Sequence, residues 1–298
     1  LDHGGHLSHG HPVNFSGLNY TFSQYEVDEK TQRIDMDKVR EVALRERPKM
    51  IIAGFSAYSR DIDWKAFKSI ADEVGAVTFG DIAHIAGLIA GKALENPVPI
   101  FDIVTTTTHK TLRGPRGAII MCKARFQKDI DRSVFPGIQG GPHDHVNAAK
   151  AVCFKEALLP AFRDYARQVI RNAQAMASEL MNRGYKILTD GTDNHLMVVD
   201  LRSKEITGKI AEVALEHVGI SCSRSTIPFD TRKAMDPSGI RLGTPSLTTR
   251  GMGTDESVLI ASLIDEAVKN HGNEAKLQSI RSQVRELSNK FPLYGGEA

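Results

Sequence analysis

The feature that most constrains the fold is a regular alternation of strand-like and helix-like segments in the first half of the chain. Apolar or β-branched runs of strand length occupy residues 50–55, 76–79, 101–108 and 117–122. Residues 63–74 place apolar side chains at helical spacing and end before Gly75. Strands that alternate with helices form βα units, so we predict an α/β fold with a mostly parallel sheet. Ligand sites in such sheets lie beyond the carboxyl ends of the strands.

The third strand leads into a lysine motif. Four consecutive threonines (residues 105–108) are followed by His109, Lys110 and a tight loop that contains Gly-Pro and two arginines. Burial and nearby cations lower the pKa of an amine, so a lysine at this place can hold an imine. An exposed strand-end lysine is the ordinary alternative. Arg113 and Arg116 are either phosphate and carboxylate partners or solvated loop charges.

Asp81 follows the second strand. Considered alone, this carboxylate is typical of a helix N-cap. A lysine one strand–helix–strand unit later favours a second interpretation, in which Asp81 pairs with a pyridinium nitrogen. Pyridoxal phosphate needs both such a lysine and such an acid. His84 lies one helical turn further on, and we expect it near the same pocket.

The opening residues 3–11 contain four histidines. Metal binding is the general interpretation of such a segment. No carboxylate or cysteine set at ligand spacing accompanies these histidines, so we expect no metal site. Gly4 and Gly5 instead permit close approach of the backbone to a ligand, which leaves His6 free to lie flat on an aromatic ring.

Two later segments carry further candidates. Residues 135–142 form a second Gly-rich loop, which is either an ordinary surface loop or a backbone cradle for a phosphate. Arg241 stands inside a short strand bounded by glycines. An arginine there fits a bidentate grip on a substrate carboxylate, and a structural salt bridge is about as good an explanation for this segment alone.

The composition excludes several classes of protein. The 298 residues include 38 basic and 36 acidic side chains, which is not a nucleic-acid-binding balance. No apolar run approaches the ~20 residues of a membrane span. Cys122, Cys153 and Cys222 are far apart and odd in number, as expected of reduced thiols in a cytoplasmic protein. The chain begins at Leu1 inside a motif, so we expect an N-terminal part to be missing.

The chain also divides in two. A helical pattern over residues 146–181 is interrupted by Pro160. We therefore predict a large domain over residues 1–158, truncated at its N-terminus, and a smaller α+β domain over residues 159–298. In the second domain we expect strands at 195–201 and 240–242, and helices at 208–217, 255–269 and 275–289.

Taken together, these segments resemble the serine hydroxymethyltransferase (glycine hydroxymethyltransferase) family across nearly the whole chain and in the same order. The resemblance rests on the His-Gly-Gly-His-Leu-Ser-His-Gly opening, residues 12–17, 54–59 and 81–84, the Thr-Thr-Thr-Thr-His-Lys-Thr core, and residues 135–142, 191–195 and 239–245. It implies the fold-type I pyridoxal-phosphate architecture, with a large, mainly parallel domain and a smaller C-terminal domain.

The resemblance also implies a role for each candidate residue. Lys110 would carry the cofactor, and Asp81 would pair with its ring nitrogen. By the same resemblance, His6 would stack on the ring, Ser56 and His84 would bind its substituents, and His109 would lie beside the lysine. Arg116 would support the site, and Arg241 would hold the substrate carboxylate. Gly141 would contact the phosphate across a dimer interface, and Leu1, Gly5, His6 and Leu7 would form part of the folate contact.

The reaction implied by the resemblance is reversible transfer of the hydroxymethyl group of L-serine to tetrahydrofolate, which gives glycine and 5,10-methylenetetrahydrofolate in one-carbon metabolism. The implied assembly is a homodimer or homotetramer with shared active sites. Two alternatives remain: another fold-type I enzyme, such as a threonine aldolase or an aminotransferase, and a non-catalytic scaffold that keeps the fold.

The resemblance has gaps. The glutamate acid/base, the substrate-side tyrosines and the Ser-Gly phosphate loop of the family would precede Leu1, so we expect the 298 residues alone to cleave little or no serine with folate. Residues 231–237 depart from the commoner family pattern, which leaves folate contacts there open.

Overall fold

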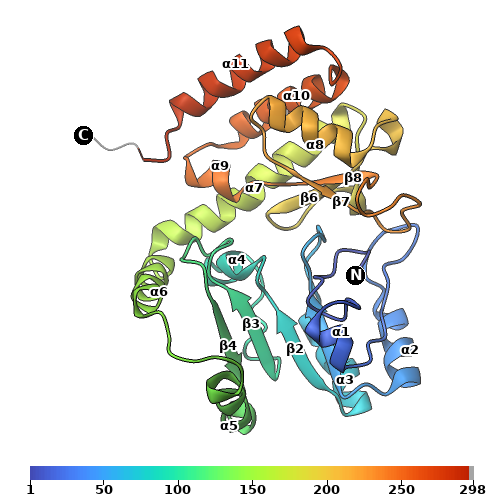
Figure 1. Ribbon diagram of the computed structural model, residues 1–298, viewed down its shortest axis with the longest axis vertical. Coiled ribbons are helices and arrows are strands. Elements are labelled where there is room, and N and C mark those ends of the chain that lie inside the picture. Colours follow the sequence, from blue (N-terminus) through green and yellow to red (C-terminus); the bar gives the residue numbers. More distant parts are fainter. Residues whose placement is uncertain (295–298) are drawn as a thin grey trace.

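The computed structural model describes residues 1–294 and contains two four-stranded sheets (Figure 1). The first sheet has the order β1-β2-β3-β4, formed by Met50–Gly54, Val77–Asp81, Ile103–Thr107 and Ala118–Cys122. Strands β1, β2 and β3 are parallel, and β4 runs antiparallel to β3. The expected mixed α/β fold with a parallel-rich sheet is therefore confirmed.

The reversal at β4 follows from the connection before it. Residues 108–117 contain no helix, and a parallel crossover normally needs one. Thr108 closes this loop on itself. Its N–H donates to the carbonyl of Gly117 (2.9 Å), its hydroxyl donates to the carbonyl of Pro115 (2.6 Å), and its carbonyl accepts from the N–H of Gly114 (2.8 Å). The lysine motif is thus held as a rigid turn.

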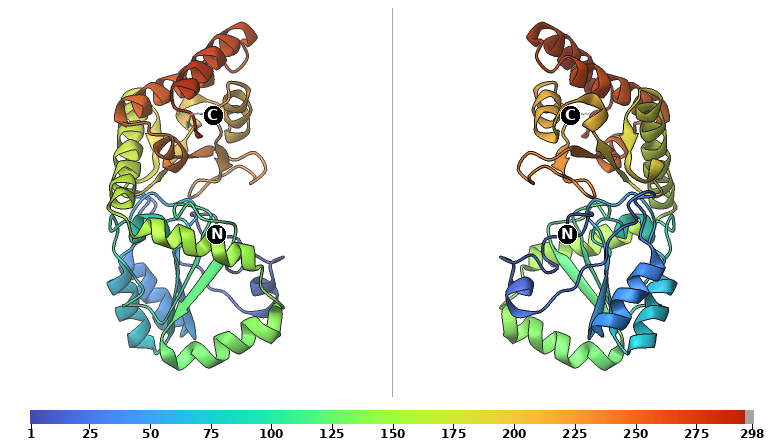
Figure 2. Two further views of the ribbon diagram at one scale, coloured as in Figure 1. Left: turned by 90° about the vertical axis from the view of Figure 1, so that its left-hand side faces the viewer. Right: turned by 90° about the vertical axis from the view of Figure 1, so that its right-hand side faces the viewer.

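Helix α3 (Trp64–Val74) packs against β1 and β2 on one face of the first sheet (Figure 2). It begins at its N-cap Asp63, ends at Gly75 in the left-handed conformation, and buries Trp64 and Phe67. The ring of Trp64 meets that of Phe101 edge-on at 5.2 Å between centroids. The other helices of this half are α1 (Phe15–Asn19), α2 (Met36–Glu46), α4 (Ala86–Ala90), α5 (Ala124–Arg132) with the π-helical turn Ser133–Ile138, and α6 (Asp144–Ala157).

The second sheet is antiparallel throughout and has the order β5-β6-β8-β7. Its strands are Lys186–Ile187, Leu196–Asp200, Gly239–Gly243 and Ser223–Ser225, in that order. Every residue of β6 is buried. The accompanying helices are α8 (Gly208–His217), α9 (Pro245–Thr249), α10 (Thr254–Lys269) and α11 (Glu274–Lys290), with 3-10 turns at Leu188–Asp190 and Arg202–Lys204.

Helix α7 (Pro160–Asn182) runs along both halves of the molecule (Figure 1, Figure 2). Its first part, from Phe162 to Val169, belongs to the core around the first sheet. Its second part, from Ala173 to Leu180, belongs to the core around the second sheet. The change of core thus falls within α7, and the boundary at residue 158/159 stays a prediction.

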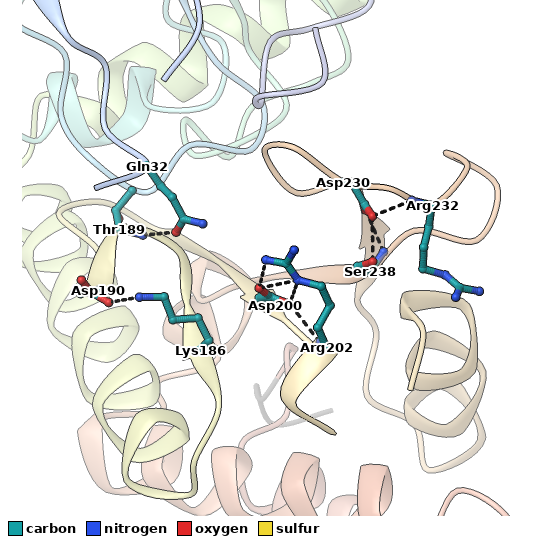
Figure 3. Close-up of polar contacts among 9 residues, drawn as sticks. All are labelled: Gln32, Lys186, Thr189, Asp190, Asp200, Arg202, Asp230, Arg232 and Ser238. Atoms are coloured by element: carbon teal, nitrogen blue, oxygen red, sulfur yellow. Dashed lines mark hydrogen bonds and ion pairs between the residues drawn. The ribbon is translucent and has the colours of Figure 1, made fainter. Parts of the chain in front are cut away.

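A cluster of hydrogen bonds joins the two halves beside the strand ends. Arg60 donates to the carbonyl of Thr189 (2.6 Å) and pairs with Asp193 (2.7 Å). The side chain of Asn194 donates to the carbonyl of Tyr58 (3.1 Å). The side chain of Gln32 accepts from the N–H of Thr189 at 3.3 Å (Figure 3). The segment that precedes β6 is therefore fixed against the loop that follows β1.

Three observations concern the classes considered from composition. No helix within residues 1–294 is both long and apolar enough to cross a membrane. The same residues contain no group of three or more His, Cys, Asp or Glu side chains arranged to hold a metal ion. Cys122, Cys153 and Cys222 are free thiols.

Candidate active site

The carboxyl ends of the parallel strands gather the candidate residues at one edge of the first sheet. The register pairs Gly54 with Asp81, and Asp81 with Thr105. Gly54 has φ +152°, and a Cβ built on it would lie 2.3 Å from the carbonyl oxygen of Asp81. Only glycine fits this close approach. Glycine at position 54 therefore lets the end of the first strand lie directly against the backbone of Asp81.

Asp81 is held as a charged carboxylate. Nε2 of His9 lies 2.7 Å from Oδ2, and the N–H of Ala83 donates to Oδ1 at 3.0 Å. Burial by itself raises the pKa of Asp81, but these hydrogen bonds and the nearby rings of His9 and His6 outweigh it, so the net pKa lies below its ordinary value. A carboxylate that stays ionised can balance a positive charge on a bound ring.

Lys110 follows the end of β3. Burial is the largest cause that lowers the pKa of its amine, Arg241 lowers it further, and Asp81 opposes the shift. The hydroxyl of Thr111 donates to the carbonyl of His84 (2.8 Å) and accepts from the N–H of Gly87 (2.9 Å). This contact fixes the lysine loop to the turn after Asp81. An amine with a lowered pKa exposes its lone pair more readily, as a nucleophile requires.

His84 and His195 form a pair between the two halves. Nδ1 of His84 lies 3.3 Å from Nε2 of His195, and the rings stack with centroids 5.5 Å apart. Burial, followed by Lys110, lowers the pKa of His84 to about 2. Burial, followed by Arg241 and Lys110, lowers that of His195 to about 3. Both rings are therefore neutral at physiological pH.

Arg241 reaches from β8 toward the first sheet. Its Nη1 donates to the carbonyl oxygen of Ser56 (2.8 Å), and burial lowers the pKa of its guanidinium. In the described part of the chain it forms no ion pair, which argues against the structural salt bridge considered from sequence. The hydroxyl of Ser56 is buried and has no hydrogen-bond partner among residues 1–294. The site thus holds a half-buried cation and an unused hydroxyl, and both can serve an anionic or polar ligand.

The N-terminal segment reaches the site, although the role of its glycines differs from the expected one. Gly4 has φ +101°, and a Cβ on it would lie 2.5 Å from the carbonyl oxygen of Ala57. The carbonyl of Gly4 accepts from the N–H groups of Ser56 (2.7 Å) and Ala57 (3.1 Å). The close backbone approach that Gly4 permits is therefore made to the chain itself and not to a ligand.

His6 and His9 come from this segment, and their positions differ. His6 is exposed, its Nδ1 lies 2.6 Å from the hydroxyl of Ser8, and burial followed by Lys110 lowers its pKa. His9 contacts Asp81 directly and meets the ring of Phe79 edge-on at 5.9 Å. Sequence reasoning named His6 and missed His9. Its position three residues after His6 is the signal that could have found it.

The remaining candidates lie around this centre or outside it. His109 and Arg116 contact each other (Nε2 to Nη1, 3.3 Å), and Arg116 is exposed. A Cβ on Gly141 would meet no atom within 4 Å, so this loop is open. Leu1, Gly5 and Leu7 lie in the N-terminal turn, where Leu7 is 60% exposed. The roles of these residues, like those of the whole site, stay predictions. His195 was not foreseen.

The family model described as "Serine hydroxymethyltransferase" matches residues 1–264. The match covers the parallel-rich sheet, the lysine turn, and the β8 strand that carries Arg241. The resemblance seen in the sequence is thereby confirmed, and the fold is that of the fold-type I pyridoxal-phosphate transferases. The chain belongs to the serine hydroxymethyltransferase family.

Proposed function

We propose that this protein catalyses the pyridoxal-phosphate-dependent, reversible transfer of the hydroxymethyl group of L-serine to tetrahydrofolate, which gives glycine and 5,10-methylenetetrahydrofolate. The observation that carries the proposal is the combination of Lys110, Asp81 and Arg241. The lysine has a lowered pKa, the carboxylate stays charged beside it, and the arginine has no carboxylate partner in residues 1–294.

The residues present fit pyridoxal phosphate. Its aldehyde requires an amine with an available lone pair, which Lys110 offers. Its ring nitrogen requires an acid that stays ionised, which Asp81 offers. The unpartnered hydroxyl of Ser56 offers a hydrogen bond to a ring substituent. When bound, the cofactor supplies an electron sink for the bonds at the α-carbon of an amino acid.

Side chains of the protein itself would bind and orient the amino acid and balance the charge on the cofactor ring. Arg241 would take the carboxylate of the amino acid in a bidentate contact and so set the orientation of the other bonds at its α-carbon. Asp81 would hold a proton on the ring nitrogen through its negative charge. The Nζ of Lys110 gives up its proton more readily than an ordinary lysine, because burial lowers its pKa.

The folate and assembly assignments belong to the same proposal. Leu1, Gly5, His6 and Leu7 would contribute to the folate site, and the open loop at Gly141 would reach the phosphate of a neighbouring subunit in a homodimer or homotetramer. His109 and Arg116 would support the lysine from the outside through their mutual contact. We place this activity in the cytoplasm and in serine–glycine interconversion.

Borohydride trapping tests the cofactor assignment. The protein is loaded with pyridoxal phosphate, reduced with borohydride and digested, and the modified peptide is identified by mass spectrometry. We expect the label on Lys110 and a loss of the cofactor absorbance band in Lys110→Ala. Lys123→Ala, which changes a lysine hydrogen-bonded to the carbonyl of Pro99, serves as the control and should keep the label. A label elsewhere, or none, contradicts the assignment.

Substrate assays separate the candidate reactions. Serine cleavage that depends on tetrahydrofolate supports hydroxymethyl transfer. Threonine cleavage without folate would favour an aldolase, and amino-group transfer to a 2-oxo acid would favour an aminotransferase. A protein that takes up no pyridoxal phosphate would favour a scaffold. Arg241→Lys should weaken the binding of serine about thirtyfold, because a bidentate contact worth about 2 kcal/mol is lost.

A further inference from the structure

The contact between His84 and His195 has a fixed geometry because both rings are carried by ordered backbone. His84 lies in the turn after β2, where its carbonyl accepts from the hydroxyl of Thr111 (2.8 Å). His195 immediately precedes β6, and its carbonyl accepts from the N–H of Thr244 (3.0 Å). The neighbouring Asn194 is fully buried and bonds across to the carbonyl of Tyr58. Neither ring reaches the other through a flexible segment.

His195 is too deeply buried to contact a ligand directly. It is only 6% exposed, and its Nδ1 is buried with no hydrogen-bond partner among residues 1–294. Its one polar side-chain contact in that range is with His84. A role for His195 must therefore act through His84.

Two neutral rings that share one N···N contact can place the hydrogen in two ways. If His84 donates from Nδ1, His195 must keep its own hydrogen on Nδ1, where no acceptor is present. If His195 donates from Nε2, its Nδ1 carries a lone pair instead. The charged groups around the pair are Arg241 from β8 and Lys110 from the lysine turn, with the ring of His6 also near His84. These positive charges favour a buried lone pair over a buried N–H.

We propose that His195 is a positioning residue that donates its Nε2 hydrogen to Nδ1 of His84 and so fixes His84 as the tautomer with its hydrogen on Nε2. Nε2 of His84 makes no hydrogen bond among residues 1–294 and is not fully buried, so it remains available to a ligand. His84 then presents a neutral N–H donor beside Lys110. The fitting ligand atom is an oxygen acceptor, such as a phenolate or phosphate oxygen.

The proposal concerns the chain's own hydrogen bond and does not depend on the proposed reaction. It can hold if the reaction is different, and it can fail if the reaction is right. A measurement on the histidine rings therefore separates the two.

Nuclear magnetic resonance on the protein with ¹⁵N-labelled histidine tests the tautomer. Long-range proton–nitrogen correlations distinguish a ring with hydrogen on Nε2 from one with hydrogen on Nδ1, and the His84→Asn variant identifies the signals of residue 84. We expect the Nε2–H form, without titration between pH 5.5 and 8.5. In His195→Phe, which keeps an aromatic ring but removes the donor, we expect the signals of His84 to move toward a mixture of both forms.

Two matched variants complete the design. His195→Gln carries an amide N–H near the place of Nε2 and should restore the spectrum of His84. His217→Asn removes a partly exposed histidine that pairs with Glu274, and it should leave the spectrum of His84 unchanged. Affinity for pyridoxal phosphate should fall about tenfold in His195→Phe and recover in His195→Gln. A native His84 with hydrogen on Nδ1, or a spectrum that His195→Phe does not alter, overturns the proposal. If His195→Phe is unfolded by circular dichroism, the native tautomer and His195→Gln decide.

Discussion

The charged groups around the second sheet have more complete hydrogen-bond and ion-pair partners than the charged groups between the two sheets. Asp265 in α10 is 1% exposed, and its carboxylate accepts from Arg183 (3.2 Å), Lys269 (2.7 Å) and Tyr185 (3.1 Å). The carboxylate of Asp200, at the end of β6, likewise accepts hydrogen bonds from Nε and Nη2 of Arg202 (Figure 3). Each of these buried carboxylates has its full set of donors from nearby residues.

The groups between the sheets lack such partners. Lys110 is near Asp81 but forms no ion pair in the described residues, and Arg241 bonds only a backbone carbonyl. His195 keeps an unused ring nitrogen, and Ser56 an unused hydroxyl. Removing one partner of a fully paired buried charge is destabilising, whereas an unpaired buried charge itself costs stability and persists where a ligand completes it. The comparison predicts that changes in the two regions affect different properties.

The largest contrast is expected between two lysines. Lys110→Met should abolish the imine absorbance band of bound pyridoxal phosphate, because the nucleophile that carries the cofactor is removed. Its thermal stability should be unchanged or higher, because the variant no longer half-buries an unpaired amine. Lys269→Met should retain the band and lose only a few tenths of a kcal/mol of stability, because its side chain is 59% exposed. Absorbance spectra after loading with pyridoxal phosphate and thermal unfolding of both variants, compared with the native protein, decide this point.

Equal loss of stability in both variants, or a persistent imine band in Lys110→Met, would contradict the contrast between the regions. The two substitutions are matched in chemistry, since each replaces an ammonium by a thioether of similar length. The two lysines differ in burial and in whether the ammonium has a carboxylate partner.

The histidine pair predicts an acid-sensitive stability. Folding keeps the rings of His84 and His195 neutral down to pKa values of about 2 and about 3, whereas the unfolded chain takes up protons near the ordinary value of 6.5. The free energy of unfolding should therefore be unaffected by this pair above pH 6.5 and decrease as the pH falls below it. The loss should reach about 2 kcal/mol for each ring by pH 5.

Urea unfolding between pH 8 and pH 5 measures this loss. In His195→Gln the contribution of one ring should disappear, which makes the curve shallower by about 1.4 kcal/mol per pH unit. His217→Asn is the control, because the side chain of His217 is 34% exposed and paired with Glu274. A curve of His195→Gln with the native slope would show that the ring of His195 is not kept neutral by folding.

Two aspartates, one from each region, are expected to affect different properties. Asp265→Asn should lower the free energy of unfolding by about 2 kcal/mol, because Arg183 and Tyr185 lose a charged acceptor in a buried place. The affinity for pyridoxal phosphate should stay near native. Asp81→Asn should show the reverse, with weaker cofactor binding and a smaller change in stability. Chemical denaturation and cofactor titration of both variants provide the test.

The sequence predicted the local elements well and the contacts between distant ones poorly. The predicted bounds of helix α8 (Gly208–His217) match the observed ones, because an N-cap threonine and apolar spacing are local signals. The strand ends that carry Asp81 and Lys110 were found for the same reason. The antiparallel direction of β4 was not stated, because a strand pattern does not encode its direction.

Contacts between residues far apart in the chain explain what was missed at the site. His9 meets Asp81, and His195 meets His84, only after the folded backbone brings the segments together. The neighbours of His195 in sequence gave no reason to separate a buried positioning ring from an ordinary core histidine. Gly4 was recognised as a place of close approach, but its partner, Ala57, belongs to another loop. Residue type and spacing therefore named the groups, and tertiary structure decided their partners.

The smallest expected effect concerns His9, which is the one site residue that behaves like those of the second sheet by completing a carboxylate. His9→Phe should raise the pKa of Asp81, because burial then acts with less opposition from hydrogen bonds. Since the native pKa is lowered, ionised Asp81 stabilises the fold above its unfolded pKa, and this contribution is lost as the pH falls through the folded value. The variant should therefore lose about 1 kcal/mol at neutral pH and progressively less in acid.

Carbon-13 titration of labelled aspartate measures the pKa of Asp81 directly, and His9→Gln, which keeps an N–H donor, should stay closer to the native value. An unchanged pKa in His9→Phe would mean that the N–H of Ala83 alone holds the charge on Asp81, and that the N-terminal histidines serve the ligand and not the carboxylate.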